Sequence, residues 1–288
     1  MPTRKGGFSV SANLRGHAAL VTGAGRNIGR AIVLALADRG CDVVVHTRAR
    51  GGDAESVAGE ARKLGVRAIV ALGDVGKRED VHAIVKTAGE LGVVDIVINN
   101  AAIRPKAPFL EMTDEDWHRV IDVDLNAAFY TARAFAPGMV ARGWGRIVNL
   151  TGMNAMAGTH DGRAHVAAAK HGLWGLTKAL SRELGPKGVT VNAISPGPIL
   201  GEQQERAAYI SSQLAKIPVG RLGWPGTAIR LRDLRRCDLS ARSYVLSRSG
   251  ARSDGVPPRT PTGRSCRGLC HLRARTCTNV GRLGRDPQ

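Results

Sequence analysis

Residues 17–29 read HAALVTGAGRNIG, a short apolar run that passes at once into a glycine-rich turn. After the turn, residues 31–39 carry apolar side chains at helical spacing. A glycine turn between a strand and a helix attracts phosphate, because backbone N–H groups and the helix N-terminus face the same anion. This stretch therefore predicts nucleotide binding at the start of an α/β fold.

The rest of the chain repeats the alternation of strand and helix. Further short apolar runs are expected to form strands at residues 41–47, 67–72, 95–99, 146–150 and 189–194. Helical patterns lie between them, among them residues 53–64 and a stretch that runs through Leu184. Continuous apolar strands alternating with helices are typical of a parallel sheet covered on both faces. Right-handed crossovers make this a Rossmann-type, doubly wound α/β fold.

The predicted fold occupies residues 17–224, after an N-terminal extension of residues 1–16. No stretch approaches the roughly 20 apolar residues that span a bilayer. Residues 1–16 also lack the apolar core of a secretory signal. We therefore expect a cytoplasmic protein without a membrane partner.

The remaining residues, 225–288, differ in composition from the body of the chain. They hold 14 arginines and four aspartates but no lysine or glutamate, so they carry a net charge of +10 out of the chain's +18. Three explanations remain open: a frameshift near residue 225 in a GC-rich gene, a disordered basic tail, or an RNA-binding arm. We favour the frameshift and expect no nucleic-acid partner. The loss of a last strand would leave the sixth strand as an exposed apolar edge, with poor solubility and reduced assembly.

The tail also contains most of the cysteines. Cys266, Cys270 and Cys277 lie close to His271, while Cys41 stands alone in the body of the chain. A metal cluster is one interpretation, but no paired C-x-x-C spacing supports it. We expect incidental cysteines and no metal site.

The glycine turn and three later motifs resemble the short-chain dehydrogenase/reductase family, and within it the 3-oxoacyl-acyl-carrier-protein reductases. The family pattern is Thr-Gly, three residues, then Gly-x-Gly, and Asn27 replaces one of those glycines. Asn tolerates a left-handed backbone, so the turn can keep its shape. The other matches are Asp74-Val75, Asn99-Asn100-Ala101 and residues 195–199, each expected at the carboxyl end of a strand. The family commonly forms homotetramers.

The resemblance implies a nicotinamide dinucleotide held along this edge of the sheet. Asp74 and Val75 would flank the adenine, Asn100 and Ala101 the adenosine ribose, and Pro196, Gly197 and Ile199 the nicotinamide. The glycine-turn residues expected to bind the cofactor are Thr22, Gly23, Gly25, Arg26, Asn27, Ile28 and Gly29.

The second strand ends without a carboxylate that would bind the ribose 2′-hydroxyl of NAD(H). Arg48 follows that strand, and Arg26 can reach the same side. Because guanidinium groups match phosphate geometry, we favour NADP(H) over NAD(H).

The catalytic positions depart from the family pattern. The family uses a Tyr as acid and base, a Lys four residues later that binds the ribose, a Ser and an Asn. Lys170 is present, but Val166 stands at the Tyr position and Met153 at the Ser position. Asp124 takes the Asn position and Gly201 replaces a Thr expected at the nicotinamide carboxamide.

Three replacements for the missing acid are open. His165 adjoins the vacant Tyr position and titrates near neutrality, although it lies about 100° around the helix from Val166. His160 and Asp161 lie in the loop expected over the substrate, and Thr151 is a displaced substitute for the Ser. The alternative is that His165 is only a polar residue at a helix start.

The sequence thus favours an NADP(H)-linked oxidoreductase acting on a small carbonyl or alcohol substrate. The runner-up is a catalytically inactive dinucleotide-binding relative that senses cofactor or scaffolds a partner. Loss of the Tyr, Ser and Asn together favours this second reading more than one substitution would.

Overall fold

The computed structural model describes residues 13–49, 51–152, 162–197, 199, 201 and 244–246, the last three by their backbone alone. These residues lie within one compact unit of the chain. His160 and Asp161, expected in the loop over the substrate, and Met153, at the expected Ser position, lie outside the described residues.

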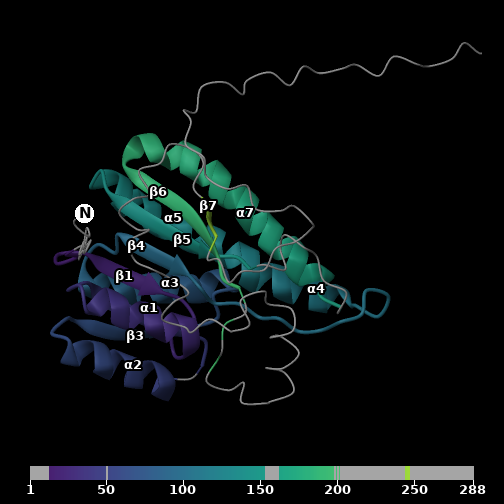
Figure 1. Cartoon of the computed structure of the whole chain (residues 1–288), viewed down its shortest axis with the longest axis horizontal. Helices are drawn as coiled ribbons and strands as arrows, with labels where there is room; N and C mark the ends of the chain where they lie inside the picture. Colours follow the sequence, from purple (N-terminus) through teal and green to yellow (C-terminus); the bar gives the residue numbers. More distant parts are fainter. Residues whose placement is uncertain are drawn as a thin grey trace, which may run out of the picture. The chain divides into compact units, whose positions relative to one another are not determined.

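A parallel sheet of seven strands forms the centre of this unit, in the order β3-β2-β1-β4-β5-β6-β7 (Figure 1). The strands are β1 (Ala18–Val21), β2 (Asp42–Thr47), β3 (Ala68–Leu72), β4 (Ile96–Asn99), β5 (Gly145–Leu150), β6 (Val189–Ser195) and β7 (Tyr244–Leu246). The order reverses between β1 and β4, which is the switch point where open α/β sheets bind ligands. The predicted Rossmann-type fold is confirmed, and its first six strands agree with the expected ranges.

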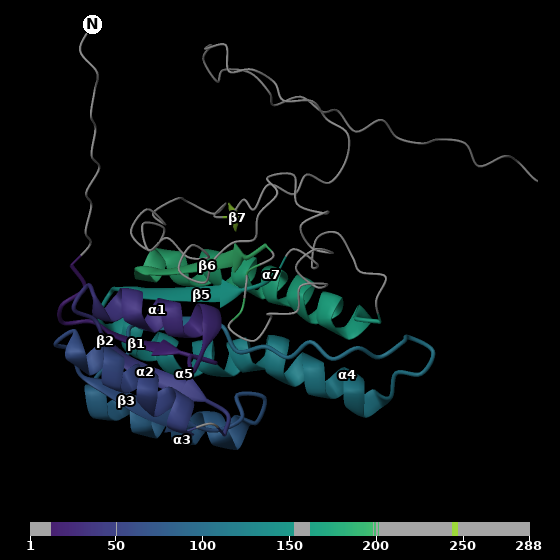
Figure 2. The same ribbon diagram turned by 60° about the horizontal axis from the view of Figure 1, so that its bottom comes forward.

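Helices cover both faces of the sheet. They are α1 (Asn27–Ala37), α2 (Gly51–Lys63), α3 (Arg78–Ala88), α4 (Asp114–Ile121), α5 (Ala127–Ala141) and α7 (Ala164–Leu184). Apolar side chains of α1 and α2 pack on one face, and those of α3, α5 and the end of α7 pack on the other. Figure 2 shows these helices around the sheet. Short helical turns follow α3 at Gly89–Leu91 and α7 at Gly185–Lys187, and a π-helical turn, Asp122–Asn126, joins α4 to α5.

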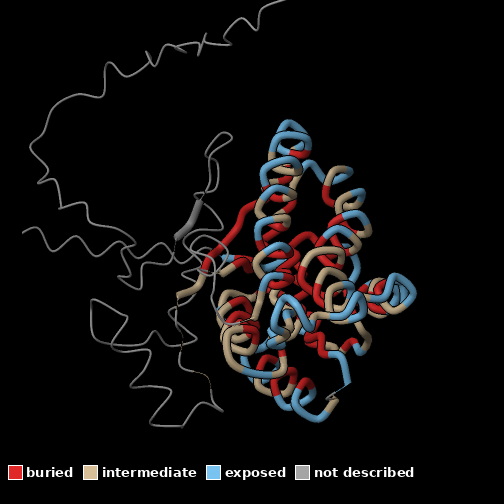
Figure 3. Tube along the Cα trace, turned by 90° about the vertical axis from the view of Figure 1, so that its right-hand side faces the viewer, coloured by how far each residue is buried: buried red, intermediate tan, exposed pale blue. Residues whose placement is uncertain are grey.

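The strands are mainly apolar because both of their faces are covered. In β1, Ala19 and Val21 pack under α1 and α2, while Ala18 and Leu20 pack on the opposite side. Figure 3 shows the result as a buried interior surrounded by helices whose outer surfaces are exposed. Alternate side chains therefore enter two separate cores, which favours aliphatic residues on both faces of a strand.

The sixth strand is not the bare edge that the sequence predicted. Tyr244–Leu246, within the tail expected to be irregular, pairs in parallel with Ala193–Ser195. The prediction that a strand beyond the sixth is lacking is therefore wrong for this stretch. Among the described strands none pairs with this side of β6 before Ala193, although Val189, Val191 and Asn192 are buried.

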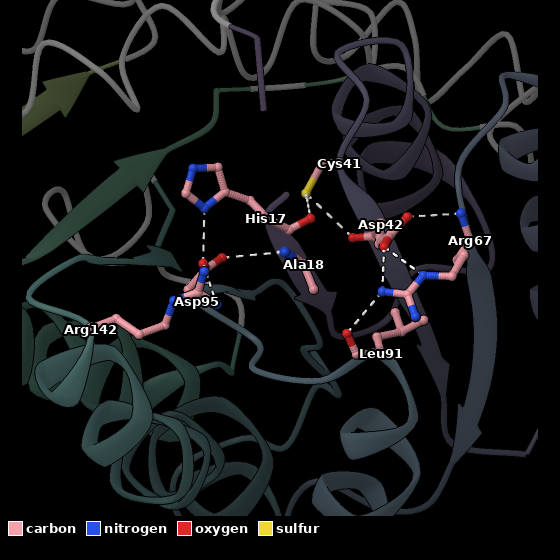
Figure 4. A network of polar contacts seen from close by, with 8 residues as sticks. All are labelled: His17, Ala18, Cys41, Asp42, Arg67, Leu91, Asp95 and Arg142. Atoms are coloured by element: carbon pink, nitrogen blue, oxygen red, sulfur yellow. Dashed lines mark hydrogen bonds and ion pairs between the residues drawn. The ribbon is translucent and has the colours of Figure 1, made fainter. Parts of the chain in front are cut away.

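Charged side chains connect the amino ends of the strands, at the edge opposite the glycine turn (Figure 4). Asp95, buried before β4, contacts His17 Nδ1 at 2.9 Å and Arg142 at 3.6 Å. Asp42 at the start of β2 forms an ion pair with Arg67 at 2.7 Å and accepts a hydrogen bond from the Arg67 amide. These contacts fix the starts of neighbouring strands, so this edge has a structural role.

No helix in the described part of the chain combines the length and apolar character needed to cross a membrane. The same residues contain no group of three His, Cys, Asp or Glu side chains arranged to hold a metal ion. The cysteines of the tail lie outside the described residues.

Candidate dinucleotide site and catalytic centre

The glycine turn is attached to the neighbouring strand through Thr22. Its hydroxyl donates to the Ile98 carbonyl at 3.3 Å and accepts hydrogen bonds from the amides of Asn100 and Ala101, both at 3.0 Å. The Asn100 amide group donates in turn to the carbonyls of Thr22 and Gly23. The ends of β1 and β4 thus form one rigid unit at the switch point.

Gly29 brings helix α1 against this unit. A β-carbon at Gly29 would overlap the carbonyl oxygen of Gly23 and lie 2.8 Å from Asn100 Nδ2. Any side chain there would move the helix away from the turn. The glycine is therefore required by close approach, as expected for a turn that presents its backbone to a phosphate.

Within the described residues, no side chain caps the N-terminus of α1. Its N-cap residue, Arg26, forms no side-chain capping bond, and Asn27 follows with a left-handed φ of 52°. This confirms that Asn27 can adopt the backbone expected of a glycine. The first N–H groups of the 11-residue helix α1 lack a side-chain cap, and such groups bind phosphate. Ile28, also expected to bind cofactor, is half-buried and packs against the core.

His46 is a central residue of the site that sequence analysis missed. It is buried in β2, where Nδ1 accepts a hydrogen bond from the Gly23 amide at 3.3 Å. Its Nε2 therefore carries the proton and donates to the Gly73 carbonyl at 3.0 Å. Burial lowers the pKa of His46, which keeps the ring neutral and its acceptor available. One imidazole thus joins the ends of β1, β2 and β3, and the only signal in the sequence was a polar residue inside an apolar strand.

Asp74 and Val75 follow β3 as predicted, but the Asp74 carboxylate already has protein partners. It accepts a hydrogen bond from the Gly76 amide at 3.0 Å and lies 3.3 Å from the Arg119 guanidinium. Val75 is buried. These contacts fix the wall of the site next to the expected adenine position.

Arg26 and Arg48 are both exposed. Among the described residues, neither guanidinium forms a hydrogen bond or an ion pair. The Ala24 amide donates to the His46 carbonyl at 2.8 Å, so the turn that bears Arg26 lies against the strand that precedes Arg48. Two cations are therefore available on the side of the turn where a ribose 2′-phosphate is expected.

Lys170 forms a buried ion pair with Asp124. The Lys170 ammonium lies 3.0 Å from Asp124 Oδ2 and donates to the Leu150 carbonyl at 3.2 Å. The other carboxylate oxygen of Asp124 accepts a hydrogen bond from the Ile103 amide at 2.8 Å. Asp124 reaches this position from the π-helical turn between α4 and α5. Both residues are catalytic candidates of the sequence, but their pairing was not predicted.

Burial is the largest influence on Lys170 and lowers its pKa, whereas the charge of Asp124 raises it. The Asp124 carboxylate therefore favours the ammonium form of Lys170, whereas burial alone favours the neutral amine. Val166, four residues before Lys170, packs with Val120 and Ala169 in an apolar cluster. The vacant Tyr position is thus filled by hydrocarbon.

His165 is fully buried beside this centre. Burial lowers its pKa, and the charges of Asp116 and Asp124 act in the opposite direction. Within the described part of the chain, no hydrogen-bond partner reaches either ring nitrogen. His165 is therefore a neutral imidazole with unused bonding capacity, next to the carboxylate that binds Lys170.

Thr151 is engaged elsewhere. Its hydroxyl donates to the Ile194 carbonyl at 3.2 Å, and its amide donates to the same oxygen at 2.8 Å. The hydroxyl of Thr151 has one proton, and the bond to Ile194 uses it to connect β5 to β6. This argues against the predicted role of Thr151 as a donor to a substrate carbonyl. Pro196, Gly197 and Ile199 follow β6 at the carboxyl edge and are half-buried.

Comparison with known proteins places this geometry in context. Residues 17–208 match the family described as short chain dehydrogenase. Nodulation protein G of Azospirillum brasilense is 41% identical over 211 residues, which cover 72% of this chain and 85% of that protein. A 3-oxoacyl-[acyl-carrier-protein] reductase of Synechocystis is 38% identical over 213 residues, or 74% of this chain and 85% of the reductase.

A solved structure from Beutenbergia cavernae also shares the fold. It is assigned as an NAD(P)-dependent gluconate 5-dehydrogenase and holds NADP at low occupancy. The alignment has a TM-score of 0.72 and 31% sequence identity, and it covers 83% of this chain and 97% of that chain.

Proposed function

Because this chain belongs to the short chain dehydrogenase family, we propose that it is an NAD(P)(H)-dependent oxidoreductase that interconverts an alcohol and a carbonyl compound. One observation carries the proposal. The uncapped N-terminus of α1 and the buried ammonium of Lys170 both belong to the carboxyl edge of the sheet, around its switch point. The first suits a pyrophosphate and the second suits a ribose hydroxyl.

The residues present fit a nicotinamide dinucleotide. Gly29 lets the turn present its backbone N–H groups, and Thr22 with Asn100 holds that turn against β4. The remaining wall residues of the proposed cofactor site are Gly23, Gly25, Asp74, Val75, Ala101, Pro196, Gly197 and Ile199. When bound, the nicotinamide accepts or supplies the hydride, and the protein supplies binding and proton transfer.

We assign the proton to His165. A lowered pKa leaves its imidazole neutral near pH 7, so a ring nitrogen can accept the hydroxyl proton as an alcohol is oxidised. In the reverse direction the same nitrogen returns the proton to the carbonyl oxygen. Lys170 would hold the cofactor ribose through its ammonium donors, and the neighbouring Asp124 carboxylate favours that charged form.

NADP(H) is the proposed cofactor form. Exposed Arg26 and Arg48 stand on the side of the turn nearest the end of β2, and the Beutenbergia cavernae relative holds NADP. A hydrogen bond to a charged group contributes about 1.5–3 kcal/mol. The Arg48→Ala variant should therefore bind NADPH roughly 10- to 100-fold more weakly and bind NADH almost as before. Equal losses for both cofactors would reject the assignment of Arg48 to the 2′-phosphate.

The first substrates to test are 3-oxoacyl thioesters, because the Synechocystis relative is a 3-oxoacyl-[acyl-carrier-protein] reductase. Simple ketones and secondary alcohols form the second panel. Turnover is followed through NADPH absorbance, and binding through NADPH fluorescence, on the full chain. His165→Asn should abolish turnover and leave the NADPH dissociation constant unchanged.

Each outcome has a distinct meaning. No affinity for NADPH or NADH in folded protein would overturn the proposed function. Binding without turnover on either panel would indicate the inactive dinucleotide-binding alternative. Turnover that survives His165→Asn would remove this histidine from the mechanism without affecting the family assignment.

A further inference from the structure

Residues 101–108, which follow β4, run past the proposed catalytic centre. The Ile103 amide donates to Asp124 Oδ1 at 2.8 Å, and the Ala107 amide donates to the Gly162 carbonyl at 2.8 Å. The segment is therefore attached both to the π-helical turn and to the residues that precede α7. These two elements contribute the charged and titratable side chains of the centre.

Arg104 lies in this segment, one residue after the amide that binds the Asp124 carboxylate. Its carbonyl accepts a hydrogen bond from Arg163 Nε at 3.4 Å, and Pro105 restricts its backbone to extended conformations. Burial is the main cause of the lowered pKa of Lys170, and the positive charge of Arg104 acts in the same direction. The Arg104 guanidinium is therefore within electrostatic reach of the catalytic centre.

The Arg104 guanidinium is exposed, and among the described residues it forms no hydrogen bond or ion pair. Residues 101–110 contain Arg104 and Lys106 but no Asp or Glu. The Asp124 carboxylate is already bound by the Lys170 ammonium and a backbone amide. An exposed cation of this kind attracts an anionic ligand, and a guanidinium can bind a carboxylate through two parallel hydrogen bonds.

We propose that the substrate is an oxo acid, or the corresponding hydroxy acid in the oxidative direction, and that the Arg104 guanidinium binds its carboxylate while the carbonyl reacts beside His165. This inference rests on the proposed function and narrows its substrate class to compounds with a free carboxylate. In the reduction the carbonyl carbon takes the hydride of NADPH, the carbonyl oxygen takes a proton from His165, and the carboxylate is unchanged.

The test compares 4-oxopentanoate with its methyl ester, which share one ketone and differ by one negative charge. On the full chain with NADPH, kcat/KM for the acid should exceed that for the ester about tenfold, as expected of a charge-assisted hydrogen bond. Added NaCl should reduce this preference, because salt screens exposed charges. A second readout needs no turnover: a ketone cannot react with NADP⁺, so calorimetry on the NADP⁺ complex measures the affinity for acid and ester directly.

Three variants locate the contact. Arg104→Ala should lower kcat/KM and affinity for the acid about tenfold, while both values for the ester, the NADPH affinity and the melting temperature stay unchanged. Arg104→Lys should recover part of the loss, because an ammonium keeps the charge but not the paired donors. Lys106→Ala is the matched control, an exposed cation in the same segment. A loss as large as that of Arg104→Ala would indicate general attraction and exclude a specific contact.

The failures of the two proposals are distinguishable. If the original chain binds neither NADPH nor NADH, both the proposed function and this inference are wrong. If it binds cofactor but treats the acid and the ester alike, in turnover and in the NADP⁺ complex, only the inference is wrong. A preference for the acid that persists in Arg104→Ala would exclude Arg104 as the residue that binds the carboxylate.

Discussion

Removal of Lys170 should destabilise the protein even without cofactor. The Lys170 and Asp124 side chains are only 5% and 0% exposed, and their charged atoms are 3.0 Å apart. At an effective dielectric constant of about 20, two unit charges at this distance attract by roughly 5 kcal/mol, and desolvation offsets much of that. Lys170→Met keeps the bulk of the side chain but leaves the Asp124 carboxylate with the Ile103 amide as its described partner.

An unpaired buried charge costs about 3–5 kcal/mol, whereas loss of both charges is close to neutral. Lys170→Met should therefore lower the unfolding free energy by that amount, on the order of 10 °C in melting temperature. The double variant Asp124→Asn, Lys170→Met should recover most of the loss. Urea unfolding of the unliganded chain measures the free energy of unfolding of the single and the double variant. The value is valid where the transitions seen by circular dichroism and by fluorescence coincide.

Lys63→Met supplies the control, because Lys63 is exposed at the end of α2. A surface substitution of this kind changes stability by no more than about 0.5 kcal/mol. If Lys170→Met and the double variant are equally destabilised, the two charges do not act as a pair, and the account of the catalytic centre is wrong.

Three further predictions concern other parts of the molecule. His46→Ala should lower the free energy of unfolding by roughly 2–5 kcal/mol, because the Gly23 amide and the Gly73 carbonyl each lose a buried partner. Hydrogen exchange at the Gly23 amide should accelerate, and an unchanged exchange rate would contradict the hydrogen bond from Gly23 to His46. The pKa of His165 is lowered from an ordinary value near 6.5, so the unfolded chain binds more protons and stability should fall as pH drops below about 6.5. The free energy of unfolding should fall less between pH 7.5 and pH 5.0 in His165→Asn than in the original chain. An identical fall in both proteins would exclude His165 as a contributor. DNA sequencing around codon 225 should reveal an acidic helix and a strand in another frame, and their absence would end the frameshift hypothesis.

The strands were predictable because each enters two cores at once. Under that constraint β1 becomes an unbroken apolar run and the centre of β2 a run of three valines. A glycine turn between such a strand and a helix is typical of a phosphate-binding turn. The backbone of Asn27 was also predictable from local sequence, because Asn is one of the few residues other than glycine that tolerate positive φ. Local sequence therefore specified the frame of the sheet and the position of the phosphate-binding turn.

Contacts between distant residues were not accessible in this way. Asp124 contacts Lys170 from within a π-helical turn, and nothing in residues 122–126 marks that turn in the sequence. His46 looks like an imperfection in an apolar strand until the ends of β1 and β3 supply its partners. The pairing of Tyr244–Leu246 with β6 was missed because the composition of the tail outweighed three residues with strand character.

The ionic contacts at the amino ends of the strands have a consequence for how this protein can change over time. His17, Asp95 and Arg142 support the scaffold from the side opposite the one that would meet a ligand. Substitutions at the carboxyl edge leave these contacts untouched, so reactive groups there can be exchanged while the scaffold is retained. Val166, which stands at the expected Tyr position, is such an exchange: it packs with Val120 and Ala169 and takes no part in the contacts of His17, Asp95 and Arg142.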